Sequence, residues 1–445
     1  MSLRFGTDGV RGVANSELTP EIALSLGRAA AKVLGRSRFL VGRDPRRSGP
    51  LLLGAFAAGL CSEGVDVVDL GVVPTPCVAW ESASMRLPAA MISASHNPFE
   101  DNGIKLFSAG GRKLPDDVEA RIEAAMASGA VGAEPPVGVD VGSVHDGRTG
   151  AASGYSDGLV DGLDGRRLEG LRVVIDCANG SASHIAPAVL RRLAPAQLTV
   201  LHASPDGINI NADCGSTHLG SLQAAVVRHR ADVGLGFDGD ADRVLAVDHQ
   251  GEVVDGDQIM AMCALDLRDR GILTNDTVVV TVMSNLGFKQ AMAHAGIEVV
   301  TTDVGDRYVL DAMEAGGCSL GGEQSGHVIF GDRATTGDGL LSGLSVLDLM
   351  VRSQRTLADL ASVMTRLPQV LRSVRGVDRA KLATAERLWA EVAAVEAGLG
   401  ESGRVNLRPS GTEPVVRVMV EAPTAAAAEA ACARLCSVVE RELAG

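Results

Sequence analysis

Four short polar stretches, far apart in a chain of 445 residues, contain the side chains best suited to chemistry. They are "SHNP" at 95–98, "DGDADR" at 238–243, "GEQSGH" at 322–327 and "RPSGTEP" at 408–414. A serine can carry a phosphoryl group, alternating carboxylates can hold a cation, and arginines beside free backbone amides can bind phosphate. Together, the four stretches predict phosphate chemistry.

The aspartates Asp238, Asp240 and Asp242 alternate with small residues, and in an extended backbone residues at this spacing face one side. Three carboxylates on one side repel unless a cation lies among them, and oxygen ligands favour Mg²⁺ or Ca²⁺. An EF-hand loop is excluded, because its sixth and twelfth positions need Gly and Glu but here hold Arg243 and His249. A magnesium site at a strand end is expected, and a solvated acidic turn is the alternative.

Ser95 ends an apolar run, and the residues after it bear on its role. Serine commonly caps a helix, but Pro98, Gly103 and the following "IKLF" predict a turn into a second strand. Without an activating group, serine is a poor nucleophile. Facing the three aspartates, it can instead carry a phosphoryl group whose oxygens complete the shell of the bound cation.

Phosphate-binding groups are concentrated near the end of the chain, although the protein as a whole is acidic. This loop is expected to form an anion site, with a polar hairpin turn as the alternative. Arg11, within "GTDGVRG", is a second phosphate-facing candidate, or else the partner in a surface ion pair. The groups of the later loop are Arg408, Ser410, the amides of Gly411 and Thr412, and Arg417.

Apolar strands alternate with stretches of helical spacing in three successive units. Strands are expected in "RFLVGRD", "VDVVDLGVV" and "AAMISAS", then in "LRVVIDC", "LTVLHA" and "DVGLGFD", and last in "TVVVTVM", "IEVVTTD" and "CSLGGEQ". Near-continuous apolar strands indicate parallel or mixed sheets covered on both faces. Such sheets bind ligands beyond the carboxyl ends of their strands, so the three polar loops are expected to line one central cleft.

The predicted architecture is α/β, with three tandem α/β domains and a smaller C-terminal α+β domain around that cleft. Helices are expected at 377–400 and 424–442. Residues 127–154 are rich in Gly, Ala and Pro, which predicts a linker or an irregular connection. The expected domains are 1–153 with the serine loop, 154–255 with the metal loop, 256–368 with a sugar-binding loop and 369–445 with the phosphate-binding loop.

The formal charge of −14 argues against nucleic acid and anionic membranes as partners, and aromatic residues at 3% offer few stacking surfaces. The eight cysteines are scattered without a CxxC pair, which is typical of buried residues in a reducing compartment. The sequence shows no signal-peptide core and no apolar run of about 20 residues. We expect a soluble cytoplasmic protein.

In this order the four loops resemble those of the α-D-phosphohexomutases, and the resemblance extends from "GTDGVRG" to the C-terminal domain. It implies an isomerase with a phosphoserine at Ser95 and one Mg²⁺ per subunit. Glu323 and Ser325 would bind sugar hydroxyls, and the 408–417 loop would hold the phosphate that is not reacting. The implied metal ligands are Asp238, Asp240, Asp242 and a phosphate oxygen on Ser95.

Within the family, the sequences "SASHNP", "DGDADR", "GGEQSGH" and "VGDRYV" are most similar to the bacterial branch that acts on glucosamine phosphates. The implied reaction interconverts glucosamine 6-phosphate and glucosamine 1-phosphate, which feeds the synthesis of UDP-N-acetylglucosamine and cell-wall precursors. It runs through a bisphosphorylated sugar, the activator and intermediate, which turns end for end in the cleft. Mannose or glucose phosphates are the alternative substrates.

Proton transfer and charge stabilisation require further residues. Lys105 and His327 are the expected proton-transfer partners, and Arg243, His96 and Arg11 complete the expected catalytic set. The expected partner is a small sugar phosphate, and neither nucleic acid nor a membrane is expected to bind. A homodimer is possible on the sequence alone. Two other classes also stay open: a metal-dependent phosphatase that uses the first aspartate of "DGDADR" as nucleophile, and a non-catalytic regulator that binds sugar phosphates.

Overall fold

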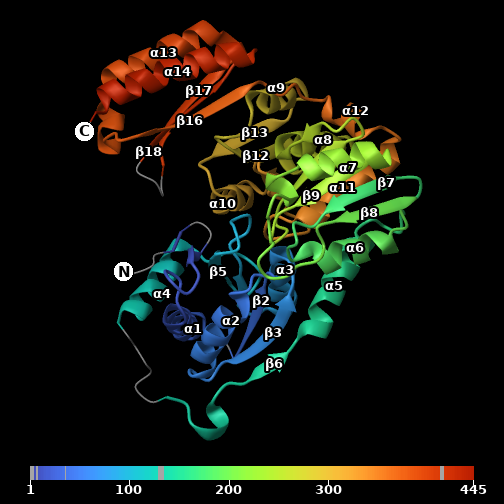
Figure 1. The fold of residues 1–445 in the computed structure, drawn as a ribbon, viewed down its shortest axis with the longest axis vertical. Helices are drawn as coiled ribbons and strands as arrows, with labels where there is room; N and C mark the ends of the chain where they lie inside the picture. Colours follow the sequence, from blue (N-terminus) through green and yellow to red (C-terminus); the bar gives the residue numbers. More distant parts are fainter. Residues whose placement is uncertain (1–4, 7–8, 36, 129–134, 411–414, 445) are drawn as a thin grey trace.

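The computed structural model describes the chain except residues 1–4, 7–8, 36, 129–134, 411–414 and 445. Four separate β-sheets follow one another along the chain. In Figure 1 the first and fourth sheets lie at opposite ends of the long axis, with the second and third between them. Helices accompany every sheet, so the molecule is a series of α/β layers that ends in a smaller domain.

The first sheet has six strands. They are β1 (Val10–Val13), β2 (Arg38–Arg43), β3 (Asp66–Val72), β4 (Ala89–Ile92), β5 (Asp101–Phe107) and β6 (Val144–Asp146). Their order across the sheet is β1-β5-β4-β2-β3-β6. Strands β6, β3, β2 and β4 are parallel, whereas β5 runs antiparallel to both of its neighbours. The chain reverses between β4 and β5 through the short loop that contains Ser95.

Helices cover both faces of this sheet, which is why its strands are apolar along their length. They are α1 (Pro20–Leu34), α2 (Gly49–Cys61), α3 (Thr75–Met85), α4 (Asp116–Ala127) and α5 (Arg148–Asp161). Phe39 and Val41 pack in one apolar cluster with α1, α2 and α4, whereas Leu40 and Met91 pack in another with α3 and α5. Alternate residues of one strand therefore bury on opposite faces.

The expectation that residues 127–154 form a linker or an irregular connection is wrong in part. Strand β6 lies in this segment and pairs in parallel with β3, and α5 begins there too. Ala151, Tyr155 and Leu159, spaced by four residues, are buried on one face of α5. This helix packs against α3 and against α6 (Ala182–Arg192), so it joins the first two sheets. The predicted first domain boundary falls within α5.

The second and third sheets repeat the plan of the first. The second consists of β7 (Arg172–Asp176), β8 (Gln197–Leu201), β9 (Val233–Phe237), β10 (Val244–Asp248) and β11 (Val253–Val254). The third consists of β12 (Thr277–Thr281), β13 (Glu298–Thr302), β14 (Leu320–Gly322) and β15 (Val328–Phe330). Strands β2, β7 and β12 each lie between two parallel neighbours. In each sheet the third parallel strand, β4, β9 or β14, is followed by an antiparallel strand, β5, β10 or β15.

One apolar cluster runs through the first three sheets and fixes them relative to one another. It contains Leu40 of the first sheet, Val173 of the second and Val278 of the third. The second and third sheets are accompanied by α7 (Gly220–His229), α8 (Gly256–Asp269), α9 (Leu286–His294), α10 (Asp306–Gly316), α11 (Gly339–Ser353) and α12 (Leu357–Ala361). Helix α11 is buried along most of its length and packs against both β10 and β15.

The fourth sheet is antiparallel and small. It consists of β16 (Gln369–Arg375), β17 (Arg404–Pro409) and β18 (Val415–Glu421), in the order β16-β18-β17. Helices α13 (Glu386–Leu399) and α14 (Ala425–Glu442) pack on it and share its apolar cluster. The helix expected at 377–400 begins as a 3-10 turn, η4 (Arg379–Thr384), before α13.

A buried ion pair within the fourth sheet makes hydrogen bonds to the third domain. Glu421, which is fully buried, accepts a hydrogen bond of 2.7 Å from Arg404 Nε and one of 2.8 Å from the backbone amide of Leu286. Arg404 Nη1 also donates to the carbonyl oxygen of Val282 at 3.0 Å. The ion pair therefore links the last domain to the loop after β12 and to the start of α9.

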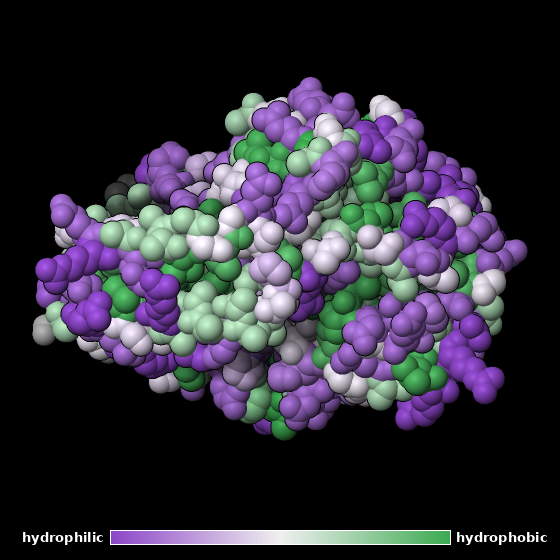
Figure 2. Space-filling view, turned by 90° about the horizontal axis from the view of Figure 1, so that it is seen from above, coloured by the Kyte–Doolittle hydropathy of each residue, from purple (hydrophilic) through white to green (hydrophobic). Residues whose placement is uncertain are grey.

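Hydrophilic side chains cover most of the periphery in the view of Figure 2, with smaller apolar areas between them. Scattered exposed apolar residues such as Val139 and Tyr308 are ordinary for a folded protein. In the described part of the chain, every helix is too short or too polar to cross a membrane.

Candidate active site

The three polar loops have equivalent positions in the first three sheets. Each follows the third parallel strand, β4, β9 or β14, and leads into an antiparallel strand. This is the edge at which α/β sheets bind ligands. Two of the loops meet directly, because Ser95 Oγ donates a hydrogen bond of 2.6 Å to Asp238 Oδ2, and both residues are buried. The structure thus brings together the predicted phosphoserine and the predicted metal loop.

The backbone at Ser95 is held in an unusual conformation. Its φ of 52° lies in the left-handed region, which is uncommon for serine and costs free energy. Its carbonyl oxygen accepts hydrogen bonds of 2.9 Å from Arg46 Nη2 and from Asn211 Nδ2, and its amide donates to Ser93 Oγ at 2.9 Å. A Cβ on Gly239 would lie 2.6 Å from the same carbonyl oxygen. Residues of two domains therefore fix the direction of the serine side chain.

The three aspartates converge, but not for the predicted reason. One carboxylate oxygen from each of Asp238, Asp240 and Asp242 lies within 4.8 Å of the others, and all three residues are buried. The expectation of an extended backbone is wrong: the chain turns here, and Ala241 has a φ of 56°. The turn, rather than the alternation of a strand, points the carboxylates toward one another.

Lys105, on β5, supplies a buried positive charge to these carboxylates. Its Nζ donates to Asp240 Oδ2 at 2.8 Å and to Asp242 Oδ2 at 3.3 Å, and Thr75 Oγ1 donates to the same oxygen of Asp240 at 2.7 Å. Burial opposes ionisation of Asp240, but the charge and hydrogen bond of Lys105 outweigh it and hold its pKa below the usual range. Burial and the charges of Asp242 and Asp240 raise the pKa of Asp238 well above its usual value.

The acidic cluster fits a metal ion on the evidence of its own atoms. Asp240 Oδ1 and Asp242 Oδ1 are buried, and within the described residues neither has a hydrogen-bond partner. A buried carboxylate oxygen without a partner is costly. Oxygen ligands at this separation suit a hard divalent cation, which would satisfy both atoms. The three aspartates can therefore bind a metal ion.

His96 lies between the serine and two arginines. Its Nδ1 is 3.3 Å from Ser95 Oγ and 3.3 Å from Arg243 Nη1. Because a guanidinium only donates, Nδ1 accepts from Arg243, and the ring proton lies on Nε2. Burial, together with the charges of Arg243 and Arg11, lowers the pKa of His96 from 6.5 to about 4. The imidazole is therefore neutral at pH 7, and Arg11 lies close enough to the site to act on it.

His327 is buried beside the metal loop. Its Nε2 is 3.9 Å from Asp242 Oδ2 and 3.4 Å from Asp306 Oδ2, and Asp306 in turn accepts a hydrogen bond of 2.6 Å from Lys113. A Cβ on Gly337 would lie 2.5 Å from the imidazole, so the ring packs directly on this glycine. The structure therefore places His327 next to the triad, as its predicted role requires.

The predicted sugar-binding residues lie on the same loop. Ser325 Oγ is 3.4 Å from Glu323 Oε2, and both side chains are partly exposed. The carbonyl of Gly326 accepts a hydrogen bond of 3.1 Å from the amide of Val244, immediately after the metal loop. Gly326 has a φ of 90°, and a Cβ there would lie 2.2 Å from the carbonyl oxygen of Val244. The third loop is thus fastened against the second.

The predicted phosphate-binding residues form a separate group. Arg408 and Arg417 lie opposite each other on β17 and β18, and the buried Ser410 directly follows β17. Burial and the neighbouring charge of Arg417 lower the pKa of Arg408. Figure 1 shows this sheet at the far end of the molecule from the first sheet. Gly411 and Thr412 lie outside the described residues.

Comparison with known families agrees with this division of the chain. Four models of phosphoglucomutase/phosphomannomutase domains match in order. They are the alpha/beta/alpha domain I at residues 2–131, domain II at 153–251, domain III at 255–367 and the C-terminal domain at 372–438.

Individual proteins match over the full length. A phosphoglucosamine mutase from Frankia casuarinae is 58% identical, over 99% of this chain and 98% of that protein. Another phosphoglucosamine mutase, from Thermobifida fusca, is 56% identical, over 100% of this chain and 99% of that protein. The chain belongs to the phosphoglucomutase/phosphomannomutase family. A solved structure of a family protein from Burkholderia thailandensis has a TM-score of 0.83 at 26% identity, over 99% of this chain and 98% of that chain.

Membership of the phosphoglucomutase/phosphomannomutase family confirms the resemblance read from the four loops and the predicted α/β class with a distinct C-terminal domain. It also confirms the expectation of a phosphohexomutase isomerase, because the curated relatives above are phosphoglucosamine mutases.

Three residues that contact the candidate site were missed by the sequence analysis: Arg46, Thr75 and Asn211. Arg46 follows β2 and Thr75 follows β3, so both lie just beyond carboxyl ends of parallel strands. That position was a usable signal, because all such ends meet at one edge of a sheet. Asn211 lies in a long loop of the second domain and reaches Ser95 through tertiary packing, which left no mark in the sequence.

Proposed function

We propose that the chain interconverts glucosamine 6-phosphate and glucosamine 1-phosphate, with Ser95 as the residue that carries the transferred phosphate. The observation that carries the proposal is the 2.6 Å hydrogen bond from Ser95 Oγ to Asp238 Oδ2, inside a buried group of three aspartates. Full-length relatives above 55% identity that are phosphoglucosamine mutases support the substrate. Each of the proposed domains 1–153, 154–255, 256–368 and 369–445 contributes one loop.

One Mg²⁺ per subunit would be held by the three aspartates and a phosphate oxygen on Ser95. When bound, it would offset the negative charge of the phosphoryl group during transfer. Two buried carboxylate oxygens that have no hydrogen-bond partner among the described residues support this assignment. The proposal includes a bisphosphorylated sugar as intermediate and activator.

The remaining steps are assigned to side chains of the chain itself. The phosphoryl group leaves Ser95 Oγ for a sugar hydroxyl, which loses a proton while the serine regains one. Lys105 and His327 are assigned to these proton transfers, because both are buried beside the aspartates. Arg11, His96 and Arg243 are assigned to orienting and stabilising the phosphate, since His96 lies beside Ser95 Oγ and the charges of both arginines act on His96.

The sugar must present either end to Ser95, so its other phosphate needs a passive site. We assign its hydroxyls to Glu323 and Ser325, since these partly exposed side chains lie on the loop beside the metal loop. Movement of the fourth domain about the loop after β12 would bring its arginines to the sugar and exclude water. The groups assigned to this phosphate are Arg408, Ser410, Gly411, Thr412 and Arg417.

The test begins with intact-mass measurement of active protein, which should find one phosphate, located on Ser95 by fragmentation. Ser95→Ala should lose turnover, and Asp240→Asn should lose metal-dependent turnover. Ser108→Ala is the matched control, because Ser108 lies after β5 and, among the described residues, its hydroxyl donates to Arg112 of its own turn. Full turnover by Ser95→Ala contradicts the proposal, and release of inorganic phosphate as the main product favours a phosphatase.

Mannose or glucose phosphate is the second candidate substrate, because the family models that match are named for phosphoglucomutase and phosphomannomutase. Competition among the three sugar phosphates, compared as kcat/KM, decides between them. A higher kcat/KM for glucose or mannose phosphate than for glucosamine phosphate would contradict the proposed substrate, but not the proposed phosphoryl transfer.

A further inference from the structure

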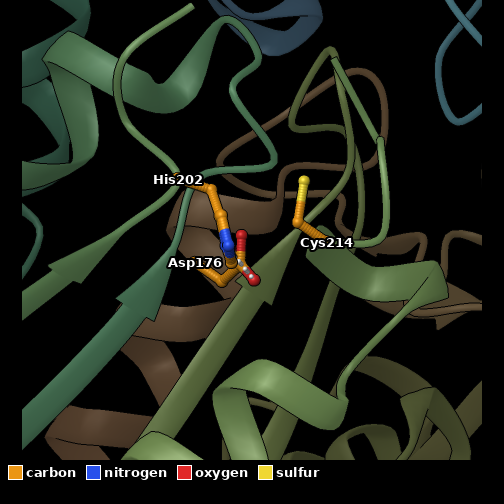
Figure 3. Close-up of side chains that lie close together, drawn as sticks. All are labelled: Asp176, His202 and Cys214. Atoms are coloured by element: carbon orange, nitrogen blue, oxygen red, sulfur yellow. Dashed lines mark hydrogen bonds and ion pairs between the residues drawn. The ribbon is translucent and has the colours of Figure 1, made fainter. Parts of the chain in front are cut away.

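A second group of metal-ligating side chains lies at the edge of the second sheet. Asp176 ends β7, His202 directly follows β8, and Cys214 precedes the short helical turn η2 (Gly215–Thr217). One ligand atom from each lies within 4.8 Å of the others. Figure 3 shows the imidazole of His202 against the carboxylate of Asp176, with the thiol of Cys214 across from them. His202 Nδ1 is 2.9 Å from Asp176 Oδ2.

The three side chains differ in how solvent reaches them. Asp176 and Cys214 are fully buried, whereas the side chain of His202 is 32% exposed. An ion could therefore enter from the histidine side and leave solvent to complete its coordination. Asp176 Oδ1 already accepts the amide of Ala178 at 2.9 Å, so the carboxylate is held in place before any ion arrives.

The donor set is unlike that of the aspartates near Ser95. Those offer oxygen atoms alone, which suit Mg²⁺, whereas a thiol, an imidazole and a carboxylate together suit zinc. A catalytic thiol is a poor explanation, because burial and the charges of Asp176 and Asp213 raise the pKa of Cys214 to about 12. The neighbouring Cys177 packs in the apolar core and is not part of the group.

We propose that Asp176, His202 and Cys214 bind one zinc-class divalent cation, separate from the magnesium site. Binding removes the proton from the Cys214 thiol and releases it to solvent, and the ring proton of His202 moves from Nδ1 to Nε2. The three ligand atoms must draw together by roughly an ångström to reach tetrahedral zinc geometry.

The positions of His202 and Cys214 in the chain indicate what a bound ion would stabilise. His202 and Cys214 lie at the two ends of one loop, so a shared ion closes that loop. The loop carries Asn211, whose Nδ2 donates to the carbonyl oxygens of Ser95 at 2.9 Å and Asn97 at 3.1 Å. In the same loop, the carbonyl oxygen of Gly207 accepts a hydrogen bond of 2.8 Å from the backbone amide of Arg47. The cation would therefore brace the loop that holds the serine.

The test uses the full chain with Ser95→Ala, in excess Mg²⁺, so that neither phosphorylation nor the magnesium site contributes. Calorimetric titration with Zn²⁺ should show one site per chain. Cys214→Ser and His202→Asn should each weaken it at least about tenfold. Asparagine is chosen because His202 has a φ of 45°, which asparagine tolerates. Cys177→Ala, the neighbouring buried cysteine, is the matched control and should bind as before.

Cobalt provides a readout that a purely structural role would not give. Co²⁺ in the same protein should show a near-ultraviolet thiolate-to-cobalt band, which Cys214→Ser removes and Cys177→Ala keeps. Circular dichroism confirms that each variant is folded. The proposal is overturned if the parent protein takes up no Zn²⁺ in excess Mg²⁺, or if folded Cys214→Ser binds it unchanged. Both measurements are independent of turnover, so they stand apart from the proposed mutase activity.

Discussion

Arg46 Nη2 donates a hydrogen bond of 2.9 Å to the carbonyl oxygen of Ser95, and the whole guanidinium is buried. The same group reaches the carbonyl oxygens of Asn97 at 2.9 Å and Asp101 at 3.0 Å. Asp44 accepts from its Nε at 2.8 Å and balances its charge. One side chain thus holds several carbonyls of the serine loop, and through them the left-handed turn that directs the serine hydroxyl toward Asp238.

We predict that Arg46→Lys lowers kcat roughly 10- to 100-fold. An ammonium group has three donors and lacks the planar fork, so it leaves buried carbonyls without partners and lets the serine shift. Steady-state kinetics with glucosamine phosphate measures the effect. Arg47→Lys, at the exposed neighbouring arginine, is the control and should be close to normal. Equal activity in both variants would show that the loop does not need this clamp.

Lys105→Met should make the metal-free protein markedly less stable. Its ammonium faces Asp240 and Asp242, and removal of one partner of a buried ion pair leaves uncompensated charge, which costs about 3–5 kcal/mol. The thermal unfolding midpoint in chelator should fall by several degrees, and added Mg²⁺ should restore more of it in the variant than in the parent. Lys32→Met, at the partly exposed pair with Glu63, is the control and should change little. A variant as stable as the parent in chelator would contradict the ion-pair argument.

His96 should titrate with a pKa of about 4 in unphosphorylated, metal-free protein, against 6.5 for an ordinary histidine. The unfolded chain then takes up a proton as the pH falls below 6.5, whereas the folded chain does so only near 4. Stability linked to His96 is therefore fully present above pH 6.5 and declines as the pH falls from 6.5 to 4. NMR titration of the imidazole gives the pKa directly.

A stability series provides the matching check on His96. The difference in unfolding free energy between the parent and His96→Gln should shrink as the pH falls across that window and stay level above it. The control is His184→Gln, at an exposed histidine on α6. An ordinary pKa near 6.5 for His96 would mean that neither burial nor the two arginines lower it.

Gly337→Ala should lower kcat about tenfold or more, with a smaller effect on KM. A Cβ at this position would lie 2.5 Å from both Cδ2 and Nε2 of His327, so the ring must move away from Asp242. Gly54→Ala, on α2, is the control, because its added Cβ meets no atom within 4 Å. Normal turnover by Gly337→Ala would argue against a role for His327 in proton transfer.

The central strands of the first three sheets were predictable because both of their faces are buried. Continuous apolar runs such as those at β2, β7 and β12 allow few other interpretations. The loops after β4, β9 and β14 were predictable as well, since polar residues there follow buried strands. The meeting of Ser95 with Asp238 was not contained in any local pattern, because it depends on how two separate domains pack.

Two local features misled the prediction for identifiable reasons. The glycines and alanines of the segment before the second sheet suggested a linker. They made the four-residue spacing of Ala151, Tyr155 and Leu159, the buried face of α5, hard to recognise. At the metal loop, alternation implied an extended chain, whereas Ala241 adopts a left-handed conformation that its side chain does not favour. Tertiary contacts decide both cases.

In each of the first three sheets one strand, β2, β7 or β12, lies between two parallel neighbours, and this shared order is the pattern expected of copies of one ancestral unit. In such copies the scaffold stays the same, and the loop after the third parallel strand is the part that differs in its side chains. Descent of this kind separates the inherited tasks. Selection can remodel the loop at Glu323 and Ser325 toward a different sugar without disturbing the serine and aspartate loops, which belong to the other two copies.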